Sequence, residues 1–273
     1  MDKGHEPGAG QLVYRQTGWT RATHWAWAIC LFFLLGSGLQ IFNAHPTLHL
    51  GQESGFDYDN SVLEIGARVA EGGPRGFLRV LGREVDTTGF LGVSGDTVQA
   101  FPAALTIPSY YSLATGRIVH FFFAWVLVAV LLIWFVAGVL TGHVRRDLVI
   151  TGTDLRSLPR DIADHARLRF HHGRRYSVLQ KLAYAGVLFV ALPLMIVTGL
   201  CMSPSFNASA PWLLDIFGGR QTARTIHFIV MLSLVAFFVI HMLMILAAGP
   251  LNELRSILTG WYRTDADEAG EGK

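Results

Sequence analysis

The sequence predicts an all-α integral membrane protein whose fold is a bundle of four transmembrane helices. Hydrophobic residues make up 51% of the 273 residues and charged residues only 15%, a balance too apolar for a soluble domain. The apolar residues are concentrated in stretches without charge, each near the roughly 20 residues that a helix needs to cross a bilayer. These stretches are 22–42, 118–142, 182–202 and 225–251. Because lipid offers no hydrogen bonds to the backbone, we expect each to be a helix.

The expected elements follow in order along the chain, which we take as a single membrane domain over residues 1–273. Transmembrane helices are expected at 22–42, 117–142, 179–202 and 224–248. A long outer loop (43–115) and a cytoplasmic loop (143–177) connect the first three. Residues 251–263 alternate apolar and polar, with Trp261 and Tyr262, which is typical of a helix lying on the inner membrane surface. No cleavable signal peptide is expected, because the first apolar run is of full length.

The distribution of basic residues predicts the orientation, since Lys and Arg stay preferentially on the cytoplasmic side. The 143–177 loop carries eight arginines: Arg145, Arg146, Arg156, Arg160, Arg167, Arg169, Arg174 and Arg175. The longer segment 43–115 carries only Arg68, Arg75, Arg79 and Arg83. We therefore expect a multi-pass protein of a bacterial inner membrane with both termini in the cytoplasm, and no nucleic-acid partner.

Four histidines lie inside the predicted spans, where such side chains are rare and usually face the bundle interior. They are His24 in the first span, His120 in the second, and His227 and His241 in the fourth. The last two are 14 residues apart (241 − 227), close to four helical turns, so both imidazoles share one helix face about 21 Å apart. This separation suits two stacked cofactors and is too long for one dinuclear metal site.

Depth in the membrane sorts the four histidines into two pairs. The second and fourth spans both enter from outside, and His120 and His227 come equally early in them. His24 lies 18 residues before the outer end of its span at Phe42, and His241 lies at a similar distance from the outer start of its own. His120 is therefore level with His227, and His24 with His241, each pair drawn from two helices.

Two imidazoles from facing helices are the ligand set of a bis-histidine haem iron, whereas zinc usually takes more protein ligands. The chain has no Cys-x-x-Cys-His motif for covalent attachment, so the pattern predicts two haems of the b type. The alternative is that these are core histidines that share hydrogen bonds. That alternative explains a single histidine better than it explains four at matched depths.

Arginines and glycines accompany the histidines. Arg21, Arg117 and Arg224 each precede a span histidine by three residues and so share its helix face. Each guanidinium is positioned to pair with a haem propionate, although arginines also extend to the membrane interface without any cofactor. Small residues give a flat macrocycle room between helices, and they equally favour helix packing. The candidates are Gly36, Gly38, Gly138, Gly142 and Gly199.

Three segments resemble the thiosulfate-reductase-type cytochrome b subunits, a group that includes membrane subunits of formate dehydrogenase and nickel-iron hydrogenase. They are residues 38–46 (GLQIFNAHP), 120–125 (HFFFAW) and 218–228 (GGRQTARTIHF), and the resemblance extends over nearly all of residues 12–263. It implies a di-haem subunit that anchors a periplasmic oxidoreductase, often a molybdopterin enzyme, and exchanges electrons with membrane quinone. It also implies His227 and His241 as ligands from one helix, completed by His24 and His120.

The outer loop departs from this resemblance, because the loop of the formate dehydrogenase type is short. Residues 43–115 are too long for a simple connector, so we interpret them either as a docking surface for the partner or as a lid over the outer haem.

Three functions remain open from the sequence. The first is an electron-transfer subunit with no chemistry beyond quinone oxidation or reduction and no catalytic residue of its own. The second is a self-contained haem b superoxide:quinone oxidoreductase. The third is a transporter whose histidines carry metal ions or protons. The long outer loop favours the first, and the two histidine pairs disfavour the third. The sequence does not decide the direction of electron flow, the quinone type, the partner's substrate or the oligomeric state.

Overall fold

The computed structural model describes residues 10–55, 57–142, 144–167 and 177–264. Within them, four helical stretches are long and apolar enough to cross a membrane, which confirms the predicted spans. They are α1 (Gly18–Phe42), α2 (Leu113–Leu140), the continuous stretch Val178–Cys201, and α8 (Arg220–Ala248). Residues 143 and 168–176 of the predicted cytoplasmic loop lie outside the described residues.

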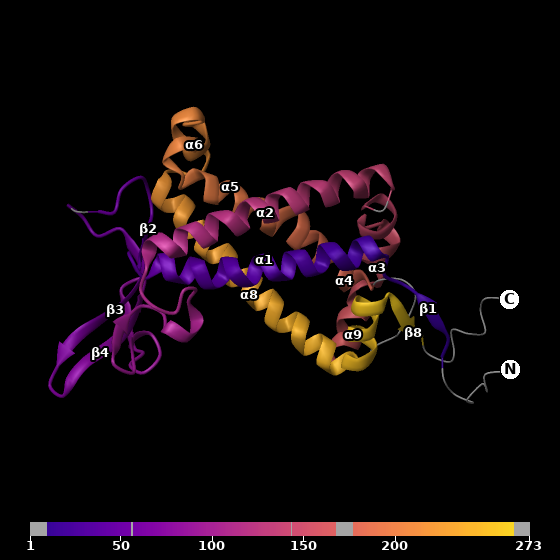
Figure 1. Cartoon of the computed structure of the whole chain (residues 1–273), viewed down its shortest axis with the longest axis horizontal. Coiled ribbons are helices and arrows are strands. Elements are labelled where there is room, and N and C mark those ends of the chain that lie inside the picture. The colour runs from indigo at the N-terminus through magenta and orange to yellow at the C-terminus, as the bar shows by residue number, and fades with distance from the viewer. Residues whose placement is uncertain (1–9, 56, 143, 168–176, 265–273) are drawn as a thin grey trace. The chain divides into compact units, whose positions relative to one another are not determined.

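Shorter elements connect these helices (Figure 1). The remaining helical segments are η1 (Ala103–Leu105), η2 (Val144–Leu148), α3 (Gly152–Ala166), α6 (Pro204–Ser209), α7 (Trp212–Ile216) and α9 (Pro250–Thr259). The strands are β1 (Leu12–Tyr14), β2 (Thr47–His49), β3 (Ser61–Ala70), β4 (Gly73–Val80), β5 (Arg83–Asp86), β6 (Gly92–Ser94), β7 (Thr97–Gln99) and β8 (Trp261–Arg263).

The third span changes helical pitch near its middle. It consists of α4 (Val178–Gly186), the π-helical turn η3 (Val187–Ala191) and α5 (Leu192–Cys201). Pro193 lacks a backbone N–H, and its ring would clash with the carbonyl four residues earlier in a regular α-helix. The wider π turn just before it relieves that clash and lets the span continue.

The chain packs into two compact units. The first comprises residues 1–26, 130–191 and 234–273, and the second comprises residues 27–129 and 192–233. Each unit contains part of every predicted span.

In the second unit, the described part of residues 43–115 contains six β-strands. The sequence predicted an all-α protein with a long outer loop, so the prediction missed this β structure. Four antiparallel strands are ordered β2-β3-β4-β5, and β6 pairs with β7 as a separate ribbon. Three glycines allow the strands to approach closely. A Cβ atom at Gly76 would lie 2.1 Å from the Leu91 carbonyl oxygen, and one at Gly92 would lie 2.0 Å from that of Gly66. The two longest strands contain neighbouring apolar residues, Val62–Leu63 in β3 and Phe77–Leu78 in β4, so their alternation of apolar and polar residues is weak.

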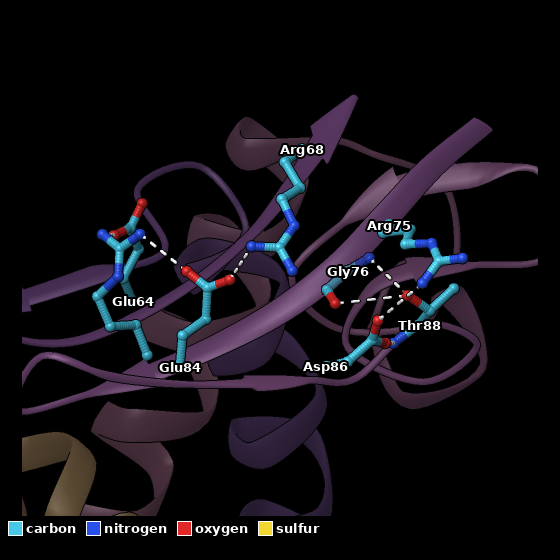
Figure 2. A network of polar contacts seen from close by, with 8 residues as sticks. Glu64, Arg68, Arg75, Gly76, Glu84, Asp86 and Thr88 are labelled. Atoms are coloured by element: carbon cyan, nitrogen blue, oxygen red, sulfur yellow. Dashed lines mark hydrogen bonds and ion pairs between the residues drawn. The ribbon is translucent and has the colours of Figure 1, made fainter. Parts of the chain in front are cut away.

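Opposite charges face one another across the sheet (Figure 2). Arg79 donates to Glu64 on β3 at 2.7 Å and to Glu84 on β5 at 3.0 Å, and both carboxylates are its cross-strand neighbours. Arg68 also pairs with Glu84. Such exposed pairs contribute little to stability, because solvent screens the charges. Their main effect is to favour this register over a slipped one, because a slip would separate the charges.

An apolar cluster joins the sheet to helices α1 and α8 within the second unit. Phe42, Leu48, Ile65, Ala100 and Phe228 are its buried members. The rings of Phe42 and Phe228 stack with centroids 4.8 Å apart. This cluster ties the ends of two helices to strands β2 and β3.

The chain around Gly51 caps the first turn of α8. The Gly51 carbonyl accepts hydrogen bonds from the amides of Gln221 and Thr222, and the Gly51 amide donates to Thr222 Oγ1 at 2.7 Å. One turn further, Thr225 Oγ1 donates to the His49 carbonyl at 2.7 Å. The first amides of a helix have no partner within it, so this contact satisfies groups that would otherwise be left unpaired.

In the first unit, the C-terminal helix ends earlier than expected. Helix α9 stops at Thr259, and Trp261–Arg263 form strand β8, which pairs with β1, instead of continuing the predicted helix 251–263. Gly260 has a φ of 89°, and its amide donates to the Ser256 carbonyl, as in a left-handed helix cap. The Tyr262 side chain is 2% exposed, and burial raises the pKa of its hydroxyl.

A shielded ion pair joins α3 to the start of the third span. Lys181 Nζ lies 3.1 Å from Asp154 Oδ1, with the two side chains 15% and 17% exposed. The other Asp154 oxygen accepts hydrogen bonds from the Thr151 amide and hydroxyl, both at 2.9 Å. These bonds, and then Lys181, hold the pKa of Asp154 below its usual range.

We expect Asp154→Asn to lower the stability of the full-length protein by about 1–2 kcal/mol, because Lys181 loses its partner. A lowered carboxyl pKa stabilises the fold above the unfolded value of about 3.9, and the benefit is lost as the pH falls through the folded pKa. Thermal unfolding in detergent should therefore show a lower midpoint for the variant at pH 7, and the gap should close at acidic pH. Asp164→Asn is the control, because Arg160 opposite Asp164 is 87% exposed at 3.9 Å. An equal loss in both variants would contradict this account.

Candidate functional site

Helices α2 and α8 bring His120 and His227 together in the second unit. The centroids of the two imidazole rings are 6.5 Å apart, and the ring planes are inclined at 57°. Both side chains are partly buried. The two residues that the sequence predicted to lie at one depth therefore face each other across two spans.

This separation fits two imidazoles that share one metal ion. A histidine nitrogen binds a first-row transition metal at about 2.0 Å, so two rings on opposite sides of one ion have centroids roughly 6 Å apart. Within the part of the chain that the structure describes, no group of three or more His, Cys, Asp or Glu side chains is placed to hold a metal. Two protein ligands are too few for a closed zinc site, but they are the full protein set for a haem iron.

Each of the two imidazoles also contacts one hydroxyl group, which comes from another helix. Ser37 Oγ on α1 lies 3.1 Å from His120 Nδ1, and Thr198 Oγ1 on α5 lies 3.0 Å from His227 Nδ1. Both hydroxyl residues are completely buried. The pattern search based on histidine, arginine and glycine missed them. A hydroxyl residue directly before a glycine is only a weak signal for them, because Thr115–Gly116 and Thr141–Gly142 at the two ends of the second span share it.

Those following glycines leave free space beside the rings. A Cβ atom at Gly38 would lie 3.4 Å from His120 Cε1, and one at Gly199 would lie 3.5 Å from His227 Cε1. A Cβ atom at either position would thus meet the ring on its Cε1 and Nδ1 side. By contrast, a Cβ at Gly36 would meet Ile107 at 2.7 Å, so Gly36 serves close packing of the chain. Gly138 lies against Val144, and Gly142 has a φ of 69° after the end of α2.

His24 and His241 belong to the first unit, and their side chains are near enough to interact electrostatically. The His241 ring stacks on Phe237 with centroids 5.8 Å apart and planes 10° apart. His24 Nδ1 is buried without a hydrogen-bond partner among the described residues. An unpaired buried ring nitrogen is costly, so His24 has a ring nitrogen available for a ligand.

The three arginines near the histidines each contact other groups of the protein. Arg21 donates to the Leu258 carbonyl, and the Arg117 guanidinium lies 5.6 Å from the centre of the Phe121 ring. Arg224 donates to the His45 carbonyl and, at 2.7 Å, to the Thr47 carbonyl. The pairing of these arginines with haem propionates stays a prediction, and for Arg224 the structure provides a role in holding strand β2.

Two further histidines, His45 and His49, lie in the segment that follows α1. Their rings lie 5.7 Å apart, with His45 exposed and His49 only 9% exposed. Burial, together with the nearby His45 and Arg224, lowers the pKa of His49, so its ring is neutral at physiological pH.

The chain is similar to one protein family and to one curated relative. Residues 152–260 match the family described as prokaryotic cytochrome b561. A second match extends over 238 residues, covering 83% of this chain and 87% of the relative at 24% identity. That relative is the putative protein-methionine-sulfoxide reductase subunit YedZ1 of Azospira oryzae. No solved structure matches the chain. Residues 152–260 therefore resemble a cytochrome b561 family, and four helical stretches of the described chain are long and apolar enough to span a membrane.

We expect Arg224→Gln to loosen the chain around His45 and Thr47, because two backbone carbonyls lose a charged donor. A loss of about 1.4 kcal/mol raises the open fraction about tenfold. Limited proteolysis of the purified protein should then cleave between residues 43 and 60 about ten times faster than in the wild type. Arg117→Gln is the control, because the Arg117 guanidinium lies over the Phe121 ring of its own helix. Unchanged cleavage in Arg224→Gln would exclude the anchoring role.

Proposed function

We propose that the protein is a di-haem cytochrome b subunit that transfers electrons between an oxidoreductase partner and the membrane quinone pool. The 6.5 Å separation of the His120 and His227 rings carries this proposal, because it suits one iron between two imidazoles. Haem iron changes between its ferric and ferrous states and so carries one electron at a time. The chain itself would bind the iron, orient the ligand rings and exclude water.

Each residue near the first pair has a separate task in this proposal. His120 and His227 would bind one iron, and the absence of side chains at Gly38 and Gly199 would leave space for the edge of the macrocycle. The buried rings of Phe42 and Phe228 lie next to the start of α8 and would keep water from that side. Arg117 and Arg224 remain proposed partners for propionates.

The second haem would lie between His24 and His241. His227 and His241 are both on α8, so one helix would supply a ligand to each haem. An electron that enters at one pair would pass to the other without leaving the protein. With both termini in the cytoplasm, the His120/His227 pair would be the outer one.

The partner is proposed to be a periplasmic oxidoreductase of the molybdopterin type, and quinone the diffusible carrier in the membrane. The relative from Azospira oryzae supports an oxidoreductase partner, because its name describes a subunit of a reductase complex. The β-sheet of residues 43–115 would be the docking surface, since it is structured and larger than a connector requires.

The haem content of the purified chain tests the proposal. A pyridine haemochrome assay should give two b haems per chain. His227→Ala and His120→Ala should each remove one haem, and His24→Ala and His241→Ala should each remove the other. The reduced minus oxidised spectrum at low temperature would show which of the two has been lost. His45→Ala should retain both haems.

Three results would contradict this proposal. Equal loss of both haems from all four single variants would contradict the pairing, and a preparation without haem would favour a transporter. Rapid reduction of quinone by superoxide with the purified chain alone would favour the self-contained enzyme.

We expect Gly199→Leu to lower occupancy of the His120/His227 haem selectively. The new side chain begins 3.5 Å from His227 Cε1 and would fill the space proposed for the macrocycle. The assay should give close to one haem per chain, with the remaining haem matching the one retained in His227→Ala. Gly186→Leu is the matched control in the same span, because a Cβ at Gly186 meets no atom within 4 Å. Two haems in Gly199→Leu would mean that the space beside His227 is not used.

A further inference from the structure

A buried hydroxyl group lies behind the His120 ring, and its own proton is already committed. Ser37 Oγ donates to the Phe33 carbonyl at 2.6 Å, four residues earlier in α1. A serine hydroxyl has one proton and two lone pairs, so the oxygen that faces His120 Nδ1 at 3.1 Å can only accept. His120 Nδ1 must therefore be the donor in this contact, and the Leu34 carbonyl is a further acceptor for the ring, as the Met195 carbonyl is for His227.

The same arrangement recurs at His227 on different helices. Thr198 Oγ1 donates to the Leu194 carbonyl at 2.6 Å and lies 3.0 Å from His227 Nδ1. It too can only accept, so His227 Nδ1 donates. In both cases the hydroxyl residue is completely buried and is followed by the glycine that leaves space beside the ring.

In a neutral imidazole only one nitrogen carries a proton. With Nδ1 protonated, the lone pair of Nε2 is free to bind a metal, and the acceptor behind Nδ1 fixes both the tautomer and the rotation of the ring. We propose that Ser37 and Thr198 are positioning residues that hold His120 and His227 as Nδ1–H tautomers with Nε2 directed to the iron. This inference rests on the proposed haem between the two histidines.

Helical packing alone does not account for the contact. Serine and threonine in membrane helices commonly bond to a carbonyl one turn earlier, and Ser233 does so with Ile229 on the lipid-exposed side of α8. Only a hydroxyl aimed at a ring nitrogen also orders a histidine. Ser37 and Thr198 each bond to a carbonyl of their own helix and also contact a histidine ring on another helix. Ser37 joins α1 to α2 in this way, and Thr198 joins α5 to α8.

A hydrogen bond from Nδ1–H has an electronic consequence for the iron. It increases the negative character of the imidazole, which stabilises the ferric state more than the ferrous state. Removal of the acceptor should therefore raise the midpoint potential of the haem bound between His120 and His227. The other haem, between His24 and His241, should not change.

The test uses Thr198→Val and Ser37→Ala in the full-length protein, with a redox titration of both haems and electron paramagnetic resonance of the ferric state. Thr198→Val keeps the shape of the side chain and removes the hydroxyl. We expect the haem to be retained and the ferrous state to be favoured by up to tenfold, an upward shift of at most about 59 mV for one electron. The ferric signal of this haem should also move, and Thr198→Ser should restore both properties.

Ser233→Ala is the control, because it removes a hydroxyl from α8 that bonds only to a carbonyl. Its potentials and ferric signals should equal those of the wild type. If Thr198→Val loses the haem, Ser37→Ala decides the matter by the same measurements on the opposite ligand. Unchanged potential and signal in the variant that retains the haem would overturn the positioning role. A wild-type chain without a haem that depends on His227 would instead overturn the proposed function.

Discussion

A buried polar group in a membrane must find its partner within the protein, and this requirement organises the helices of the second unit. His120 and His227 each place a ring nitrogen among apolar side chains, and each nitrogen contacts a hydroxyl from another helix. Each hydroxyl in turn bonds to a carbonyl of its own helix. Two short chains of hydrogen bonds thus link α1 to α2 and α5 to α8. The 6.5 Å spacing of the rings depends on both chains, because either ring could otherwise rotate away from its partner.

The sheet of residues 43–115 is in turn held in place by contacts with helix α8. Gly51 caps the first turn of α8, Thr225 bonds to the His49 carbonyl, and Arg224 bonds to the Thr47 carbonyl. All three contacts lie within two turns of His227 on its helix. The segment that we interpret as a docking surface is therefore held by the residues that precede a proposed haem ligand. A partner that docks on the sheet would be placed near the site that receives or delivers the electron.

The sequence predicted the spans because an apolar run of membrane length has few other structures available to it. It also identified His120 and His227, since their depth follows from chain direction alone. The sheet was missed because its two longest strands do not alternate cleanly between apolar and polar residues, and the hydropathy of a segment does not reveal that Gly66 and Gly76 are covered by neighbouring parts of the chain. Ser37 and Thr198 were missed because most hydroxyls in such helices bond only to their own backbone. The carbonyl partners of Arg224 lie 177 and 179 residues away, beyond any local pattern.

The hydrogen bonds between Gly51 and α8 also join segments that are synthesised at different times. Gly51 and its partner Thr222 are 171 residues apart, so the segment that completes the first turn of α8 leaves the ribosome long before the helix that it completes. At synthesis rates of 5–20 residues per second the interval is roughly 10–30 s. During that interval β2 lacks the contacts with Thr225 and Arg224 that later hold it. The hydrogen bonds that hold β2 against α8 can thus form only after the last span has been synthesised.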